Sequence, residues 1–463
     1  MRTNLLLSLF LAVVVGCTKP NPNRCCIDEA DCAAAGLPVG MTCNEGRVCR
    51  GNVCIEESCE TANECDLAAP YCVMPPGGAC SDRCTEDSQC PGKGQPTEAQ
   101  FCVSDECVEC RAANDCSGAT PVCKGGLCMS CAEHDQCASG VCKDGGQCAA
   151  ETEIAYVNAI GLPTSDCTAA SPCSTIERAL AFATTRPYVV VNPGTYNRTG
   201  PLTLASAHWI VGRGTPRPVI DRIDDGPIFY IQGSANAHLE QLELTGATGL
   251  AVNGDLVAGY AILCKKGALT PTLSLRSLSV HDVERGVASR GCIMSVVRST
   301  FVNAAIELVD TSATLDANVF TGSNVSLDAG LFTFTNNYVA RVPSGGLAMY
   351  LPSTGNVVAF NTIVDARVLC EVVSAQAFPN NIVARSGDLP VGTMCSFPGT
   401  IVAPTDLTAL KFKHPDSAPY DYHLMPGSSA IDAAVGTSSL NHDIDGEARP
   451  KGAGRDVGAD EAQ

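Results

Sequence analysis

A six-residue pattern that returns about every 20 residues limits the folds open to this chain more than any other feature of its sequence. The copies are LEQLEL (239–244), LRSLSV (275–280), VRSTFV (297–302), LDANVF (315–320), FTNNYV (334–339), VAFNTI (358–363) and FPNNIV (378–383). They start 36, 22, 18, 19, 24 and 20 residues apart, and the longest interval predicts a weak extra copy around Leu256. Many β-branched residues and little helical periodicity make this repeat typical of a solenoid of strands rather than a sandwich.

The fourth position of the pattern changes to asparagine in the last four copies. Its residues are Leu242, Leu278, Thr300, Asn318, Asn337, Asn361 and Asn381. Asparagine is a poor strand former, but it tolerates a left-handed backbone and its amide can both donate and accept hydrogen bonds. If each copy spans a strand, a sharp bend and the next strand, the four amides lie about 4.8 Å apart in consecutive coils and form a ladder. The apolar first and sixth positions then face the interior.

The segment before the repeat, residues 155–197, combines a disulfide loop, a helix and a strand. Cys167 and Cys173 are predicted to close a small loop. Apolar spacing predicts a helix over 175–184 that begins at Thr175 or at the serine before it, and a strand and a PGT turn follow. This order closely resembles the opening of the pectate-lyase-like right-handed parallel β-helix family, in which a short helix caps the first coil.

The segment after the repeat, residues 420–461, resembles the terminal block of many secreted bacterial β-helix proteins. The matching elements are Y-x-L, AID, D-x-D-G-x-x-RP and D-x-GA-x-E. We expect this block to seal the last coil and to protect its open edge. The two resemblances imply an all-β fold over residues 151–463, a right-handed parallel β-helix (solenoid) with a short N-terminal cap helix.

Cysteine usage divides the chain into two parts. Of 29 cysteines, 23 precede residue 150, and C-x5-C units recur there. The units start at Cys26, Cys59, Cys84, Cys110 and Cys131. Such short units cannot bury enough apolar surface to fold alone, so disulfides worth about 2–4 kcal/mol each must stabilise them. Residues 25–150 therefore read as small disulfide-rich repeats, and they resemble the cysteine-rich repeats of exported bacterial surface proteins.

A metal-binding interpretation of these cysteines competes with the disulfide interpretation. Cys107, Cys110, Cys128 and Cys131 have the spacing of a four-cysteine zinc ribbon. The repeat register explains the same spacing more simply, since the first cysteine of each C-x2-C closes one unit and the second opens the next. Metal sequestration by this half of the chain would require free thiols.

The first 17 residues predict export. Arg2 precedes an apolar stretch that is too short to span a bilayer, and Val14-Val15-Gly16-Cys17 resembles a bacterial lipobox. We expect residues 1–17 to be a lipoprotein signal peptide with Cys17 lipidated, and residues 18–24 to be a tether. A plain secretory signal is the alternative. The resemblance implies a protein lipid-anchored at the bacterial outer membrane or cell surface.

Catalytic and metal-binding candidates are few. Asp282, Glu284 and Arg285, with Arg298 one coil later, are the nearest grouping to the calcium-binding acids and basic residue of a pectate-lyase mechanism. The favoured interpretation of these residues is that they are exposed charges on a turn. In the DIDG stretch, Asp443 and Asp445 are calcium candidates, although the 12-residue calcium-loop pattern does not continue. No other cofactor is expected.

Charge and composition narrow the partners. The net charge of −19 argues against a nucleic-acid partner. The sequence contains no GxSxG, HExxH or phosphate-binding glycine loop. We expect a structural, adhesive or glycan-binding role through the β-helix, with the membrane and an extracellular polysaccharide or cell-surface component as partners. The alternative is a polysaccharide lyase or glycoside hydrolase that acts on extracellular polysaccharide.

Overall fold

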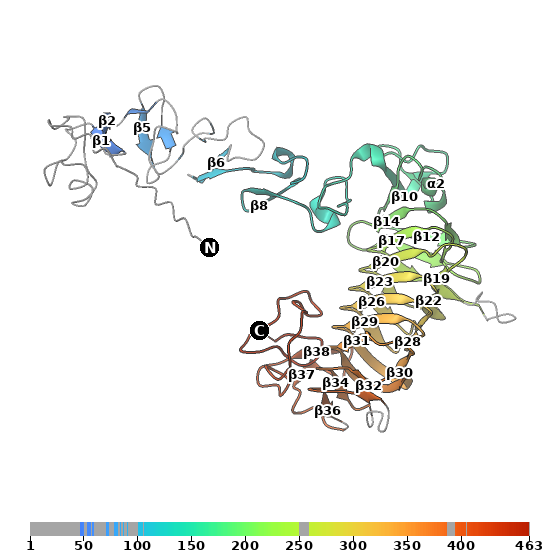
Figure 1. Cartoon of the computed structure of the whole chain (residues 1–463). Helices are drawn as coiled ribbons and strands as arrows, with labels where there is room; N and C mark the ends of the chain where they lie inside the picture. Colours follow the sequence, from blue (N-terminus) through green and yellow to red (C-terminus); the bar gives the residue numbers. More distant parts are fainter. Residues whose placement is uncertain are drawn as a thin grey trace, which may run out of the picture. The chain divides into compact units, whose positions relative to one another are not determined.

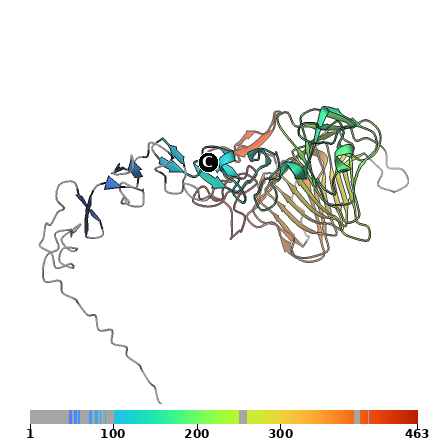
Figure 2. The same cartoon turned by 90° about the horizontal axis from the view of Figure 1, so that it is seen from above.

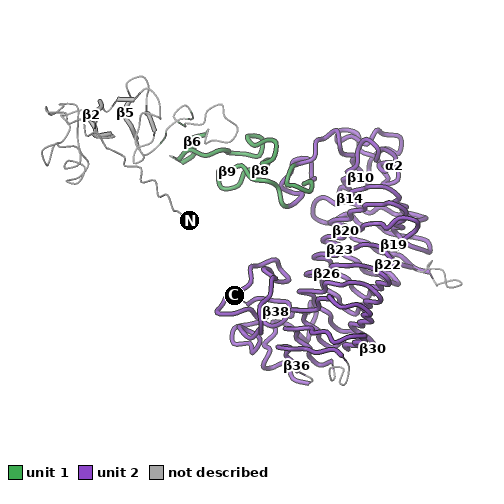
Figure 3. The backbone as a smooth tube through the Cα atoms, viewed as in Figure 1, with its two compact units in different colours: residues 1–132, 142–147 green, residues 133–141, 148–463 purple. Residues whose placement is uncertain are grey.

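The protein is described by a computed structural model that covers residues 101–104, 106–249, 259–386, 394–403 and 405–462, with short strands and single positions between 47 and 90. It has two compact units (Figure 3), residues 1–132 with 142–147 and residues 133–141 with 148–463. The units therefore do not divide at residue 150. The predicted signal peptide, Cys17 and the tether lie outside the described residues. No helix in the described part has the length and apolar character needed to cross a membrane.

In the three repeats that the structure describes, which start at Cys84, Cys110 and Cys131, the first cysteine pairs with the third and the second with the fourth. The disulfides are Cys84–Cys102, Cys90–Cys107, Cys110–Cys123, Cys116–Cys128, Cys131–Cys142 and Cys137–Cys148. In two repeats the third and fourth cysteines face each other across a two-stranded hairpin. The zinc-ribbon interpretation is wrong, because all four cysteines proposed for it are oxidised in disulfides.

The strands of these repeats are short and antiparallel. They are β1 (Arg47–Arg50), β2 (Val53–Glu56), β3 (Ser58–Cys59), β4 (Tyr71–Val73), β5 (Gly78–Ser81), β6 (Phe101–Val103), β7 (Glu106–Val108), β8 (Val122–Lys124) and β9 (Leu127–Met129). Single 3-10 turns η3 (Ala113–Asp115) and η4 (His134–Gln136) precede the second cysteine of their repeats. The buried apolar residues described between positions 84 and 132 are cysteines and Val122. Disulfides thus take the place of a hydrophobic core.

The second unit is a parallel β-helix, as predicted (Figure 1), in which each coil pairs in parallel with the next. One face is a nine-stranded sheet. Its strands are β10 (Ile154–Leu162), β11 (Tyr188–Val191), β14 (His208–Gly212), β17 (Asn236–Glu240), β20 (Thr272–Arg276), β23 (Ile293–Val297), β26 (Ser312–Asp316), β29 (Leu331–Thr335) and β31 (Val357–Ala359). The coils superimpose when viewed along the stack (Figure 2). Right-handed winding is the sense that parallel crossovers adopt.

A second sheet forms the other two faces. One arm contains β12 (Thr195–Arg198), β15 (Val219–Arg222), β18 (Glu243–Thr245), β21 (Ser279–Val280), β24 (Thr300–Val302), β27 (Val319–Thr321), β34 (Ile382–Ala384) and β36 (Ile401–Ala403). The other arm contains β13 (Leu202–Leu204), β16 (Phe229–Ile231), β19 (Tyr260–Lys265), β22 (Arg285–Arg290), β25 (Ile306–Val309) and β28 (Val325–Asp328). The long strands β30 (Tyr338–Leu351) and β32 (Thr362–Val372) turn the corner and join the arms. β33 (Gln376–Ala377) pairs with β35 (Cys395–Ser396) in a separate ladder.

Strand pairing corrects the predicted register at two places. Val296 pairs with both Leu275 and Leu315, so the third copy begins at Val296 rather than one residue later, and Ser299 replaces Thr300 at its fourth position. β17 pairs directly with β20, which leaves no coil for the copy predicted around Leu256. The extra residues form an insertion between β18 and β19, of which 250–258 lie outside the described residues. An eighth copy, FPGTIV at 397–402, was missed.

The asparagines of the fourth position stack along one corner. The Nδ2 of Asn318, Asn337 and Asn361 each donates to the Oδ1 of the asparagine in the next coil, at 3.0 Å. The same Oδ1 atoms accept a backbone N–H from the preceding coil. Ser299 and Thr400 extend the arrangement at its two ends. All four asparagines are buried, so each amide satisfies groups that the bend would otherwise leave unpaired.

The left-handed residue of this corner is the third position, not the fourth. Its members with positive φ are Gln241, Ser277, Arg298, Ala317, Asn336, Phe360 and Asn380. In FTNNYV the two adjacent asparagines therefore have different tasks, since Asn336 adopts the left-handed bend and Asn337 provides the ladder amide. The first and sixth positions face one continuous apolar core, in which Phe301 and Phe320 stack at 5.2 Å.

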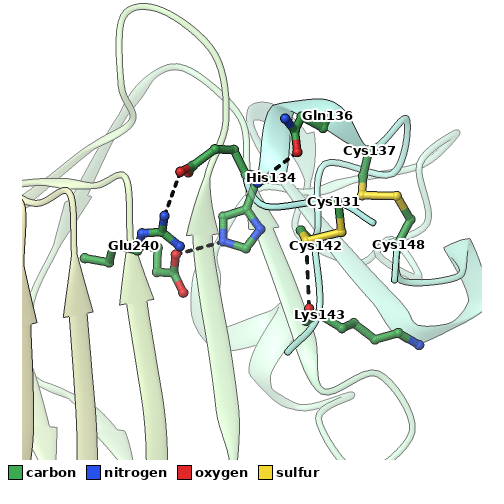
Figure 4. The surroundings of a disulfide bond; sticks show 10 residues. Cys131, His134, Gln136, Cys137, Cys142, Lys143, Cys148 and Glu240 are labelled. Atoms are coloured by element: carbon green, nitrogen blue, oxygen red, sulfur yellow. Dashed lines mark hydrogen bonds and ion pairs between the residues drawn. A yellow bond between two sulfur atoms is a disulfide. The ribbon is translucent and has the colours of Figure 1, made fainter. Parts of the chain in front are cut away.

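The N-terminal end of the solenoid is closed by a helix and by part of the last cysteine repeat. α2 (Ile176–Leu180) is shorter than predicted and begins after Thr175, whose hydroxyl accepts the Arg178 N–H. Cys167 and Cys173 form the predicted disulfide, and η5 (Glu151–Glu153) leads into β10. His134 lies against Glu240 of β17 at 2.9 Å (Figure 4). Residues 133–141 of this repeat thus pack onto the first coils.

The terminal block packs on the outside of the last coils, where it forms a second apolar cluster with β30, β32 and β34. Its hairpin consists of β37 (Phe412–His414) and β38 (Asp421–Leu424). The elements D-x-D-G-x-x-RP and D-x-GA-x-E meet inside it, because Arg449 of the RP pair donates to Glu461 at 3.0 Å and both side chains are buried. Arg449 also donates to the carbonyls of Asp456 and Gly458, which satisfies the buried guanidinium.

Candidate functional site

The four predicted catalytic residues do not form one site. Arg285 donates to the hydroxyl of Tyr260 at 2.9 Å and lies 3.4 Å from Glu307. Arg298 lies at another corner, 3.5 Å from Glu133. Among the described residues, no hydrogen bond or ion pair joins two of the four predicted side chains.

The two acids of this group point outward. Asp282 is 84 % exposed and contacts only the neighbouring ring of His281 in the described structure, while Glu284 is exposed. A mechanism with calcium-binding acids beside a basic residue needs these groups on a common surface. Asp282 and Glu284 therefore lie as solvated charges on the surface, as the favoured interpretation has it.

The predicted calcium acids have separate surroundings. Asp443 is buried, and its oxygens accept the backbone N–H groups of Asp445, Glu447 and Glu461. Asp445 instead contacts Nε2 of His423 at 2.7 Å. This hydrogen bond, followed by the one to Asp421, raises the pKa of His423 to about 9 against the effect of burial. Asp443 thus holds a tight turn together, and Asp443 and Asp445 do not face one ion.

A different group of charged side chains lines a cavity on the solenoid. Arg341, Asp365 and Arg385 occupy the same place in three consecutive coils, two residues after the sixth position of the repeat, and all three have positive φ. Equivalent residues of adjacent coils stack, so the two guanidinium groups lie on either side of the carboxylate. Arg341 Nη1 is 3.3 Å and Arg385 Nη2 is 2.9 Å from Asp365 Oδ2.

The cavity has a volume of about 570 Å³. Its lining consists of Arg341, Val342, Asp365, Ala366, Arg367, Arg385 and Ser386. Val342 and Ala366 are buried and form its apolar floor, whereas Arg367 is exposed. It lies where β30 and β32 turn the corner between the two arms, next to a shift in the pairing register. The change from short to long strands therefore shapes the cavity.

The terminal block contributes two further groups beside this cavity. The guanidinium of Arg341 lies 4.5 Å from the centre of the Tyr420 ring, and Arg385 pairs with Asp416 at 2.6 Å. Burial alone would lower the pKa of Arg385, but hydrogen bonds to Asp416 and Asp365 raise it above its usual value. Arg385 therefore stays cationic, and each carboxylate is already engaged by an arginine.

This arrangement suits anion binding better than acid–base chemistry. Arginine binds carboxylate and sulfate groups through paired N–H donors, and three arginines here face two carboxylates in a chain of net charge −19. A general acid or base needs a carboxyl group free to exchange its proton. We call the set Arg341, Asp365, Arg367 and Arg385 the arginine cavity.

Sequence reasoning missed the arginine cavity although a signal was present. Arg341, Asp365 and Arg385 each lie seven residues after the start of their copies, at 334, 358 and 378. The prediction concentrated on charges close together in the chain, such as those around Asp282. In a solenoid, a common offset from the repeat predicts proximity better than closeness in sequence.

Comparisons with known proteins give structural similarity only. No known protein family matches the chain, and no curated protein is significantly similar to it in sequence. A rhamnogalacturonan lyase aligns over 51 % of this chain and 75 % of its own, with a TM-score of 0.39 and 12 % identity.

Two further solved structures are pectate lyases. Pel9A aligns over 67 % of this chain and 96 % of its own, with a TM-score of 0.39 and 13 % identity. Bsp165PelA from Bacillus sp. N165, solved in complex with trigalacturonate, aligns over 51 % of this chain and 80 % of its own, with a TM-score of 0.28 and 16 % identity. At such low identities, the assignment of the fold rests on the strand pairing of this chain, and its function has to be argued from its own residues.

Proposed function

We propose that this protein is an exported, lipid-anchored surface protein whose β-helix binds an acidic extracellular glycan in the arginine cavity. The observation that carries the proposal is the stack of Arg341, Asp365 and Arg385 over an apolar floor. An acidic sugar presents carboxylates to the guanidinium groups and an apolar ring face to Val342 and Ala366. Tyr420 beside Arg341 offers a further stacking surface.

Export and anchoring rest on the lipobox-like stretch at Cys17, and the extensive disulfide pairing agrees with an oxidising compartment. The cysteine-rich repeats then separate the β-helix from the membrane. The role is binding rather than cleavage, because the carboxylates at the cavity are held in ion pairs. A polysaccharide lyase or glycoside hydrolase remains the competing outcome of the same experiment.

The test measures binding and cleavage together. The oxidised chain is titrated calorimetrically with polygalacturonate and with neutral dextran, and the mixtures are assayed for new reducing ends and unsaturated products. We expect binding of the acidic polymer that weakens with salt, no binding of dextran and no cleavage. Arg385→Gln should weaken binding at least tenfold.

The exposed Arg290, at the end of β22, provides the matched control. Arg290→Gln removes one positive charge from the same unit and should bind polygalacturonate like the wild type. Equal affinity of Arg385→Gln and Arg290→Gln would overturn the cavity as the binding site. Product formation abolished by Arg385→Gln would replace the binding role with an enzymatic one.

A further inference from the structure

The terminal block contains a second cluster of titratable side chains, separate from the arginine cavity. His423 lies on β38, and Asp445 and Asp460 come from the segment that follows the hairpin. One potential ligand atom from each residue lies within 4.8 Å of the other two. Donors around a single zinc ion lie about 3.3 Å apart, so small side-chain rotations bring these three to such an ion.

A buried hydroxyl without a partner lies at the same cluster. Tyr338 of β30 is 4 % exposed, and its hydroxyl makes no hydrogen bond within the described residues. Its ring lies edge-on to the His423 ring at 5.8 Å. Burial, and after it the negative charges of Asp460 and Asp445, raises the pKa of this hydroxyl well above its usual value. An unpaired buried hydroxyl destabilises the folded state, and a bound ion would remove this cost.

The other nitrogen of the His423 ring is oriented as metal-binding histidines usually are. Nδ1 contacts the carboxylate of Asp421, which fixes the ring and leaves Nε2 directed toward Asp445. A carboxylate on the outer nitrogen is the common support of a histidine ligand. Asp460 is oriented in a similar way, since one of its oxygens accepts the N–H of Leu424 at 2.6 Å.

We propose that His423, Asp445 and Asp460 bind a divalent metal ion of the zinc class, with the Tyr338 hydroxyl at the fourth position. An imidazole nitrogen with two carboxylates and one further oxygen is a zinc-type ligand set, whereas calcium requires six to eight oxygens. His423 and Asp445 are 36 % and 50 % exposed, so an ion can enter from solvent. The ion joins the terminal block to β30 and thereby holds this block against the last coils.

The experiment uses the oxidised full chain without a histidine tag, stripped with EDTA and titrated with Zn²⁺ by calorimetry, alongside thermal unfolding. We expect one ion per chain and a rise in Tm on its binding. His423→Gln should remove this ion and the rise in Tm, and Asp445→Asn should weaken binding at least tenfold. Co²⁺ in the unmodified protein should give the visible absorption of a four-coordinate ion, a readout that needs no variant.

His281 supplies the matched control, because its ring also lies between two carboxylates, Glu243 at 3.1 Å and Asp282 at 2.9 Å. His281→Gln should bind Zn²⁺ like the wild type. Unchanged stoichiometry in His423→Gln, or no effect of Zn²⁺ on Tm, overturns the site. A stronger response to Ca²⁺ than to Zn²⁺ overturns the assignment of the metal.

Discussion

The cysteine-rich repeats and the β-helix solve the same problem in opposite ways. Each repeat is too short to bury a core, and the apolar groups it does bury are nearly all disulfide sulfurs. Each coil of the solenoid is equally short, yet it buries its apolar residues against the next coil in one continuous core. In the cysteine-rich part, covalent bonds within each repeat take the place of the contacts that a coil of the solenoid makes with its neighbours. A segment of about 20 residues therefore folds stably only with disulfides of its own or with apolar packing against its neighbours.

The largest expected difference between the two parts is their response to a reductant. Reduction should unfold the repeats, since each disulfide contributes about 2–4 kcal/mol and no core remains. The β-helix should keep its structure, because its disulfides Cys264–Cys292 and Cys370–Cys395 lie in a packed core, where Cys264, Cys292 and Cys370 are almost fully buried. Hydrogen exchange followed by mass spectrometry, with and without dithiothreitol, should show lost protection over 106–132 and retained protection over 272–384.

A reversed pattern of protection would contradict the comparison. Uniform loss of protection in both segments would mean that the solenoid also depends on its disulfides. The control is the same reductant followed by reoxidation, which should restore the protection of residues 106–132.

The terminal block tests whether stacking alone stabilises the solenoid or whether the block packed on the outside of the last coils is also needed. Glu461→Ala leaves the Arg449 guanidinium buried beside a cavity, and burial already lowers the pKa of Arg449. We expect a loss of about 4 kcal/mol in the free energy of unfolding, measured by denaturant titration. Glu447→Ala, which breaks the more exposed pair with Lys451, should change it by less than about 1 kcal/mol. Equal effects would mean that the buried pair has no special role.

The ladder tests stacking in the middle of the solenoid. Asn361→Ala removes one amide and leaves donors or acceptors of Asn337 and Asn381 unpaired in the interior. We expect a loss of about 3 kcal/mol in the free energy of unfolding, with the cysteine-rich repeats unaffected. Asn197→Ala, at an exposed position of β12, should change this free energy by less than about 0.5 kcal/mol. A similar small effect at Asn361 would show that the core, not the ladder, sets the register.

Much of this architecture could be predicted because a solenoid repeats its constraints. Asn318, Asn337, Asn361 and Asn381 recur at similar intervals, and stacking requires the same residue type in each coil. The first apolar position was likewise recognisable in most copies. The parallel β-helix followed from these residues, whereas the export signal remains a prediction.

The errors arose where the spacing of the copies in the sequence does not determine which residues pair between strands. Corners accept insertions, so the long interval before Leu275 suggested a hidden coil although the strands on either side pair directly. Val297 resembled a core residue as much as Val296 did, and only pairing with the neighbouring strands selects Val296. The arginine cavity was missed because its residues become neighbours through stacking. Sequence spacing gives the number of coils better than it gives the contacts between them.

The smallest expected difference between the two parts is in how their stability depends on pH. Disulfides carry no charge, whereas His281 on the surface of the solenoid lies between Glu243 and Asp282. Burial alone would lower the pKa of His281, but the hydrogen bonds to Asp282 and Glu243 raise it above 6.5. Because the folded pKa is the higher one, the stabilisation is complete below the unfolded pKa and is lost as pH rises through the folded pKa.

We therefore expect the β-helix to lose stability as pH rises above the unfolded pKa of about 6.5, by an amount that the exposure of the pair keeps small, with no matching loss in the cysteine-rich repeats. Denaturant unfolding of His281→Gln in EDTA should show a shallower slope, because His423, whose pKa is raised to about 9, still contributes to it. His414→Gln, at an exposed position of β37, should keep the full slope. A slope of equal size in His281→Gln would place the titrating group elsewhere on the solenoid. A slope of the opposite sign would mean that burial lowers the pKa of His281 by more than the two carboxylates raise it. The surface charge of these coils would then destabilise the solenoid at low pH instead of stabilising it.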